Sequence, residues 1–125
     1  MDAKILHANV FTKEIIETIK YTQKSDAFVY TGGITWLEEK ERTVEELVVE
    51  HPSWAIWLYN HKFAMLFTEE QIDYLCLQKP TLFIEMLHDQ IMLTDNQVRM
   101  LHKSAPDLAL FWLKDRLLLL QKKES

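Results

Sequence analysis

Cysteine, glycine and proline are scarce in this sequence of 125 residues. Cys76 is the single cysteine, so the chain can form neither an internal disulfide nor a cysteine-rich zinc or iron–sulfur site. Two glycines and three prolines are too few for an all-β fold with many tight turns. The sequence has no run of about 18 apolar residues and no signal-peptide pattern at its start. We therefore expect a cytoplasmic protein without a membrane span.

The composition is that of one folded domain. Hydrophobic residues make up 48% of the chain and charged residues 26%, which excludes disorder of the low-hydrophobicity kind. The net charge of −5 argues against direct nucleic-acid binding, which normally uses a basic surface. Acidic side chains are concentrated between Glu38 and Glu50. This stretch is either a solvated helix face or a surface for a basic partner.

Three segments carry the same helix-start pattern at a nearly constant spacing. They begin at Thr43, Thr68 and Thr94, which are 25 and 26 residues apart. Each is a capping box, in which a threonine hydroxyl accepts from the third helical amide and a Glu or Gln side chain accepts from the threonine amide. The residue four positions after each threonine is aliphatic: Leu47, Ile72 and Val98.

Three prolines, Pro52, Pro80 and Pro106, fall in phase with the capping boxes. Proline is favoured in the first helical turn, where its missing amide proton would be unpaired. Apolar residues stand two, three, four and six positions after each proline. These patterns predict a degenerate repeat of about 26 residues, made of two short helices that stack against their neighbours. The expected helices cover residues 43–50, 52–61, 69–78, 80–89, 95–103 and 106–121.

The proline and capping-box pattern over residues 43–120 resembles short α-helical hairpin repeats, including the leucine-rich variant repeats. The period here is slightly longer, and the cysteine cluster of some of those proteins is absent. The resemblance implies a curved binding scaffold. We predict an all-α fold, a compact stack of short helical hairpins over residues 43–121, within a single domain 1–125 that begins with a distinct segment 1–42.

The segment 1–42 follows a different pattern. Thr12 can cap a helix that reaches about Lys24, with isoleucines on one stripe. Residues 28–37 leave two interpretations open. Two β-prone stretches around the glycine pair indicate a small β-hairpin, whereas two short helices broken at the glycines would extend the helical pattern. We favour the helices, because an isolated hairpin is marginally stable in water.

The sequence carries no recognisable catalytic signature. Its five histidines form no close metal-ligand pair, and residues 31–34 lack the further glycines, lysine and hydroxyl of a P-loop. Cys76 lies between two leucines and is expected to be a buried, inert thiol. We expect no cofactor and no metal. An enzyme would need a pocket that holds His61 or His88 with an acid in reach.

Two apolar segments can belong either to the core or to an interface. Aromatic residues crowd residues 54–67, and such side chains dominate both cores and binding hot spots. The helix expected over 106–121 is apolar around nearly its whole circumference. Because the end of a helical stack needs a cover, either the N-terminal helix or a second copy of the chain is expected to pack there. The second case would give a homodimer through the C-terminal helix.

By elimination, we predict a non-catalytic protein–protein interaction module. It would be a small acidic adaptor or inhibitor that docks on a larger protein, by analogy with phage-type inhibitors of host defence proteins. One alternative is a nucleic-acid-mimicking regulator that uses the acidic face Glu38–Glu50, and another is an enzyme of unrecognised type. The residues predicted to bind the partner are Glu38, Glu39, Glu45, Glu46, Trp57, His61, Leu117 and Leu119.

Overall fold

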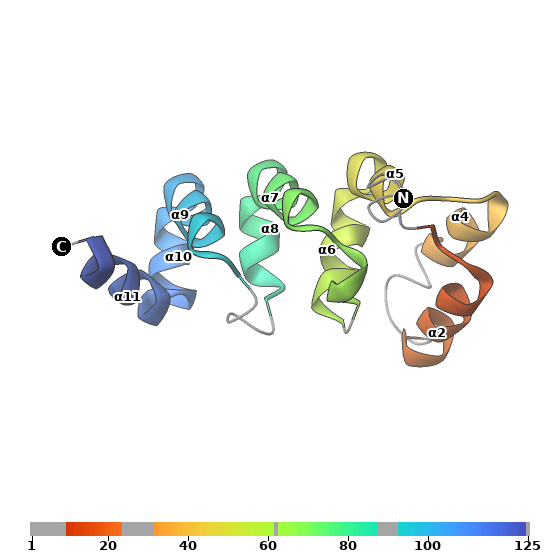
Figure 1. Ribbon diagram of the computed structural model, residues 1–125, viewed down its shortest axis with the longest axis horizontal. Helices are drawn as coiled ribbons and strands as arrows, with labels where there is room; N and C mark the ends of the chain where they lie inside the picture. Colours follow the sequence, from red (N-terminus) through yellow and green to blue (C-terminus); the bar gives the residue numbers. More distant parts are fainter. Residues whose placement is uncertain (1–9, 24–31, 62, 88–92, 125) are drawn as a thin grey trace, which may run out of the picture.

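The computed structural model describes residues 10–23, 32–61, 63–87 and 93–124. In these residues nine α-helices and one 3-10 helix follow one another, and the β-structure is limited to a single bridge between Val10 and Thr43. The predicted all-α fold is confirmed. The helices pair into short hairpins that stack in a row (Figure 1). No helix in the described ranges is both long enough and apolar enough to cross a membrane.

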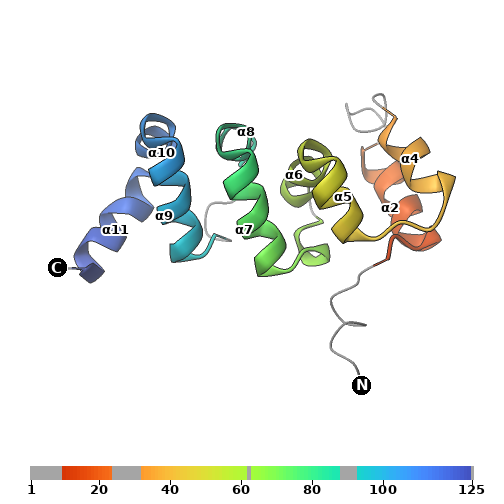
Figure 2. The same cartoon turned by 90° about the horizontal axis from the view of Figure 1, so that it is seen from above.

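Three hairpins form the middle of the row. They lie in two layers, because each first helix packs on the first helix of the next hairpin and each second helix on the next second helix (Figures 1 and 2). The predicted start of every one of these helices is confirmed to within a residue. The hairpins are α5 (Val44–Glu50) with α6 (Pro52–Asn60), α7 (Glu69–Gln78) with α8 (Pro80–Glu85), and α9 (Asp95–Ser104) with α10 (Pro106–Trp112).

Both hydrogen bonds of every predicted capping box are present. In each box the threonine hydroxyl accepts from a backbone amide, and the threonine amide donates to a side-chain oxygen. These contacts lie within four residues of sequence, so the helix starts depend on local sequence alone. The pairs are Thr43 with Glu46 (3.1 and 3.1 Å), Thr68 with Gln71 (3.1 and 3.0 Å) and Thr94 with Gln97 (3.0 and 3.0 Å).

The capping glutamines also join each hairpin to the one before it. The Nε2 of Gln71 donates to Oε1 of Glu45 on α5 at 3.0 Å, and the Nε2 of Gln97 donates to Oδ1 of Asp73 on α7 at 2.9 Å. Both glutamines are nearly buried. Each glutamine therefore satisfies its own helix start and fixes how the first helices of neighbouring hairpins align. We call these two contacts the glutamine bridges.

The aromatic segment 54–67 belongs mainly to the core. Trp57, Tyr59 and Phe63 are all less than 10% exposed, and the 3-10 helix η1 (Ala64–Leu66) packs its Leu66 inward. The predicted burial of Cys76 is also confirmed, since its side chain is completely inaccessible. Burial raises the pKa of the Cys76 thiol to about 12, which keeps it protonated and unreactive.

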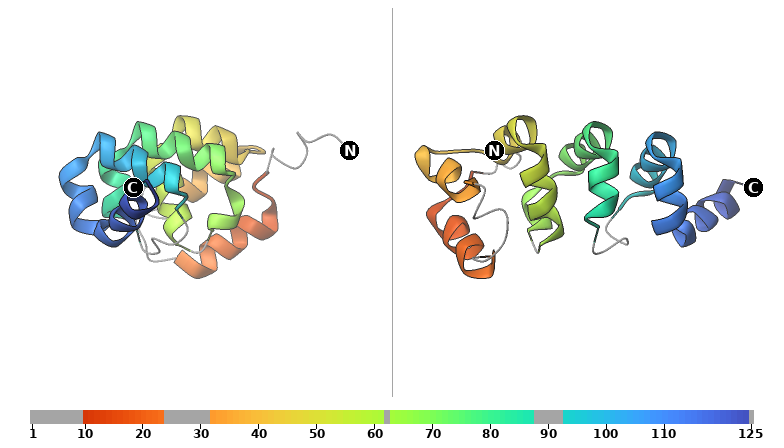
Figure 3. Two further views of the ribbon diagram at one scale, coloured as in Figure 1. Left: turned by 60° about the vertical axis from the view of Figure 1, so that its left-hand side comes forward. Right: turned by 180° about the vertical axis from the view of Figure 1, so that it is seen from behind.

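The first described helix is α2 (Lys13–Gln23), which begins after Thr12 as predicted. The Thr12 hydroxyl accepts from the Ile15 amide at 3.2 Å, and Ile16 and Ile19 of the expected stripe are buried. The helix packs against α4 (Gly33–Glu39) at the end of the row opposite α11 (Lys114–Glu124), as Figure 3 shows.

The β-hairpin interpretation of residues 28–37 is wrong in its second half, because Gly33–Glu39 forms α4. Residues 28–31 lie outside the described residues. Gly32, with φ at +92°, turns the chain into the helix, a conformation that favours glycine. Ile34 and Leu37, three positions apart, then both face the core as a helix requires.

The single helix predicted over residues 106–121 is also wrong. The chain breaks at the fully buried Leu113, which separates α10 from α11. The break lets α11 fold back onto α9, where Nη2 of Arg116 donates to the Leu93 carbonyl at 2.8 Å. The predicted extent of α8 to residue 89 is likewise too long in the described residues, since α8 ends at Glu85 and residues 88–92 are not described.

Candidate interaction surfaces

Three of the predicted acidic contact residues pair with cations of the same chain. The Nζ of Lys20 donates to Oε2 of Glu38 at 2.7 Å, and Nη2 of Arg42 donates to Oε1 of Glu39 at 2.7 Å. Arg42 also lies 3.7 Å from Glu46, whose other oxygen caps α5. The hydrogen bond from Lys20 to Glu38, and a second one to Glu17, raise the pKa of the Lys20 ammonium above its ordinary value. This acidic stretch is therefore partly neutralised within the molecule.

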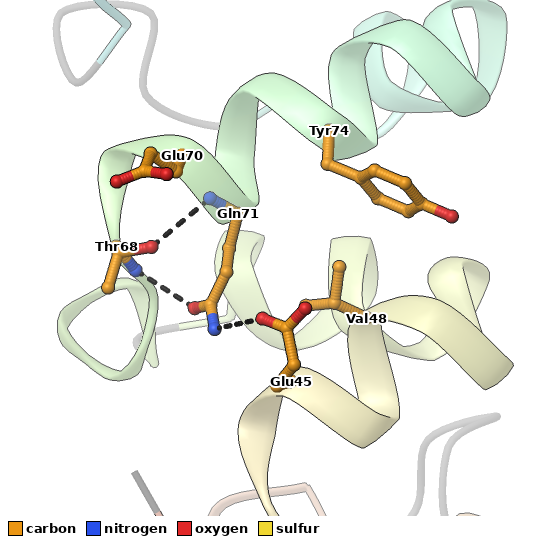
Figure 4. Close-up of a pocket in the computed structure, with 6 residues that line it drawn as sticks. All are labelled: Glu45, Val48, Thr68, Glu70, Gln71 and Tyr74. Carbon is orange, nitrogen blue, oxygen red and sulfur yellow. Dashed lines mark hydrogen bonds between the residues drawn. The ribbon is translucent and has the colours of Figure 1, made fainter. Parts of the chain in front are cut away.

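Glu45, the fourth predicted acid, borders a pocket of about 280 Å³ between α5 and α7 (Figure 4). Its carboxylate accepts the hydrogen bond of a glutamine bridge, so the pocket lies at the junction of two hairpins. The close-up places the Tyr74 ring to one side of this junction, with Glu70 near the start of α7. Among the described residues, no cluster of three or more His, Cys, Asp or Glu could hold a metal ion. The pocket lining includes the Gln71–Glu45 hydrogen bond that aligns the two hairpins.

Trp57 and His61 lie inside the first hairpin. Trp57 is 9% exposed, and its indole stacks on the His61 ring with 4.1 Å between the centroids. The Nδ1 of His61 lies 2.6 Å from the Trp57 carbonyl oxygen. These two residues stabilise the end of α6, and Trp57 offers almost no surface to a partner. His88, the other candidate histidine, lies outside the described residues.

The predicted leucines lie on α11, at the far end of the row from the acids (Figure 1). Leu119 is 54% exposed, whereas Leu117 is half-buried against the core. The structure therefore brings the two leucines onto one helix but does not bring them near the acids or the Trp57–His61 pair. The eight predicted residues form no single site.

A further apolar surface lies on α10, within the C-terminal segment 106–121 that was predicted as a core or interface segment, but none of its residues is among the eight predicted contact residues. Leu110, Phe111 and Trp112 are 53%, 74% and 49% exposed, and the Phe111 and Trp112 rings meet edge to face at 4.9 Å between centroids. We call these three residues the terminal face. Their position in the repeat draws attention to them, since Leu110 is the fourth residue after a repeat proline, as Ile56 and Ile84 are in the earlier hairpins.

Comparison with the other hairpins explains why the terminal face is exposed. The residues equivalent to Leu110 are Ile56 in α6 and Ile84 in α8, and they are 0% and 2% exposed. α6 is followed in its layer by α8, and α8 by α10. In the described residues no second-layer helix follows α10. Among the described residues, the terminal face thus corresponds to a surface that a second-layer helix covers in the earlier hairpins and leaves uncovered here.

A groove of about 470 Å³ adjoins this face between α9, α10 and α11. Leucines form most of its apolar wall, and Leu110 belongs to both the groove and the terminal face. The described residues that line it include no carboxylate. They are Leu110, Leu117, Leu118, Leu120, Arg99, His102, Lys114 and Gln121.

No family model matches the chain, and neither a curated protein nor a solved structure matches it. Its function must therefore be argued from the geometry of its own surfaces.

Proposed function

We propose that this chain is a non-catalytic protein–protein interaction module, an adaptor or inhibitor that docks on a larger protein through the terminal face. The observation that carries the proposal is Leu110, 53% exposed at a position where the two preceding hairpins bury an isoleucine. Repeat stacks normally end in a polar cap. An exposed apolar end that includes a tryptophan is typical of a contact surface.

The ion pairs do not favour the nucleic-acid mimic. Glu38 and Glu39 each hold a lysine or arginine of this chain within 2.7 Å, which weakens the negative field they would present to a basic groove. The net charge of −5 is small for such a mimic. The enzyme alternative gains no support from His61, which contacts the backbone and the indole of Trp57.

The proposal is tested by capture from a nuclease-treated lysate of the source or host cell. The baits are the native chain, Phe111→Asp on the terminal face, and Met65→Asp as a matched control, since Met65 is 75% exposed in the middle of the row. We expect the native and Met65→Asp baits to retain one stoichiometric protein that Phe111→Asp loses. Circular dichroism checks that all baits are folded, and Leu110→Gln replaces Phe111→Asp if that variant is not.

Two outcomes contradict the proposal: no stoichiometric protein on the native bait, or equal capture by both variants. Where a partner with a measurable activity is found, adding the free chain separates the two forms of the proposal. An inhibitor lowers that activity, whereas an adaptor leaves it unchanged.

A further inference from the structure

We propose that the groove between α9, α10 and α11 receives an acidic amphipathic helix of the partner protein. This inference rests on the proposed docking function and gives the chemistry of the partner.

The position of the groove favours a helix as its occupant. In the second layer, α8 packs on α6 and α10 packs on α8, so each of these surfaces is shaped to receive a helix (Figures 1 and 2). Leu110, which lines the groove, stands where Ile56 and Ile84 are covered in the earlier hairpins. A helix with apolar side chains at positions i, i+3, i+4 and i+7 would present one row of knobs to the leucines of the groove.

The charges around the groove favour an acidic helix. Arg99 and Lys114 are the cationic residues that line it beside the leucines, and none of its described lining residues is acidic. A helix with carboxylates beside its apolar stripe would meet these cations at the rim, which steers the encounter and fixes the orientation.

The same cations argue against a second copy of the chain in the groove. In a symmetric dimer the same patch faces itself, so the patch that carries Lys114 and Arg99 would lie against an identical positively charged patch. Like charges in contact suppress such a pairing. The homodimer predicted from the leucine-rich helix is therefore the competing outcome of the experiment.

The probes are two labelled synthetic peptides of about 18 residues, long enough for several helical turns. Both carry leucines at i, i+3, i+4 and i+7. One carries glutamate and the other lysine at the flanking positions. Fluorescence anisotropy measures the affinity of each for the full chain. We expect the glutamate peptide to bind about tenfold more tightly at low salt, and the preference to shrink at about 0.5 M salt as screening increases.

Substitutions in the groove assign the binding to it. Lys114→Glu should weaken the glutamate peptide about tenfold and strengthen the lysine peptide, and Leu118→Asn should weaken both. The matched controls are Lys79→Glu and Leu77→Asn, at exposed positions of the second hairpin outside the groove, which should change neither affinity. Leu118 is 49% exposed, so its substitution leaves the fold intact, and Leu110→Asn provides a second variant at the same wall.

The inference is overturned if the two peptides bind with equal affinity, or if the control substitutions lower the affinity as much as the groove substitutions do. A dimer seen by sedimentation velocity that Leu118→Asn dissociates also overturns it, because a second copy would then fill the groove. If Phe111→Asp abolishes lysate capture while neither peptide binds, the docking function stands and the acidic helix fails. If the glutamate peptide binds but no lysate partner is captured, the groove does receive an acidic helix and the proposed docking function fails.

Discussion

A glutamine at the third position of a capping box can do what a glutamate there cannot. Its oxygen accepts from the threonine amide while its NH2 group donates to a carboxylate of the preceding hairpin. Gln71 and Gln97 both do this. The first box has Glu46 instead, and there the neighbouring group is the cationic Arg42. The choice between Glu and Gln therefore follows the charge of the group that each box faces.

Gln71→Glu tests this role of the glutamine bridge. The new carboxylate still caps α7 but faces the carboxylate of Glu45 in place of a hydrogen-bond donor. We expect the free energy of unfolding at neutral pH to fall by about 1–2 kcal/mol, measured by urea denaturation. Adding Glu45→Gln in the same chain should restore most of the loss. Unchanged stability, or a loss that Glu45→Gln does not relieve, would show that the bridge contributes little.

Thr68→Ala tests the capping box itself. The substitution removes the hydroxyl that accepts from the Gln71 amide at 3.1 Å. We expect a loss of about 1 kcal/mol in the free energy of unfolding, the usual cost of an N-cap threonine. Thr81→Ala is the control, because Thr81 is exposed on α8 and lies outside the capping boxes. Its effect should stay within about 0.5 kcal/mol in the same denaturant titration.

At the level of the helices, the starts were predictable from sequence and two of the ends were not. A capping threonine and its partner three residues on, such as Thr68 and Gln71, fix a start through contacts that any reader of the sequence can identify. The break at Leu113 has no such local signal, because neither proline, glycine nor a capping threonine stands beside it, and the polar residues 114–116 that follow are also common within a helix. It depends on the fit of α11 against α9, in which Asp95 contacts Arg116 and Lys123, 21 and 28 positions later.

The candidate site was predictable only in part, for the same reason. Glu38 was predicted as a contact residue, but the sequence does not show that Lys20, 18 positions earlier, lies beside it. The α4 helix likewise depends on a tertiary contact, since the Arg42 guanidinium lies over the Trp36 ring at 4.1 Å and its Nε donates to the Trp36 carbonyl. The Lys20–Glu38 pair follows from the folded arrangement, whereas the Glu39–Arg42 pair has an i,i+3 spacing that is visible in the sequence.

The contact between α9 and α11 predicts a specific dependence on pH. The hydrogen bond from Lys123 at 2.8 Å, and then the pairing with Arg116, lower the pKa of Asp95 from its ordinary value of 3.8. A carboxylate with a lowered pKa in the folded state stabilises the fold above its unfolded pKa. That stabilisation is lost as the pH falls from about 3.8 through the lower folded value. Asp95→Asn should therefore flatten the acid side of the stability curve.

The measurement is the thermal unfolding midpoint between about pH 2 and pH 7, where acidic groups titrate. Asp107→Asn is the control, because Asp107 is an exposed acid in the first turn of α10. We expect its curve to run parallel to that of the native chain, whereas the Asp95→Asn curve approaches the native one at low pH. Two parallel curves would show that the ion pairs of α11 are too exposed to matter.

At the scale of the whole molecule, the stability of each hairpin depends on the hairpins packed beside it. In a repeat stack, each unit contacts only the units beside it. The free energy that stabilises a unit is therefore approximately its intrinsic folding free energy plus the free energies of its two interfaces. Among the described helices, α8 packs between α6 and α10, whereas α11 packs mainly on α9 and α10. The arrangement that leaves Leu110 exposed therefore also gives α11 fewer stabilising interfaces than α8 within the described residues.

Two buried substitutions test this distribution. Leu120 on α11 is 4% exposed and Phe83 on α8 is 0% exposed, so alanine at either position leaves a cavity that costs a few kcal/mol. Leu120→Ala should accelerate amide hydrogen exchange in α11 and α9 and leave α5 and α6 at the native rates, measured by mass spectrometry of peptides. Phe83→Ala should accelerate exchange in the helices on both sides of α8. If Leu120→Ala instead raises exchange in α5 as much as in α9, the molecule unfolds as one cooperative unit and the terminal face cannot open or reshape by itself when a partner docks.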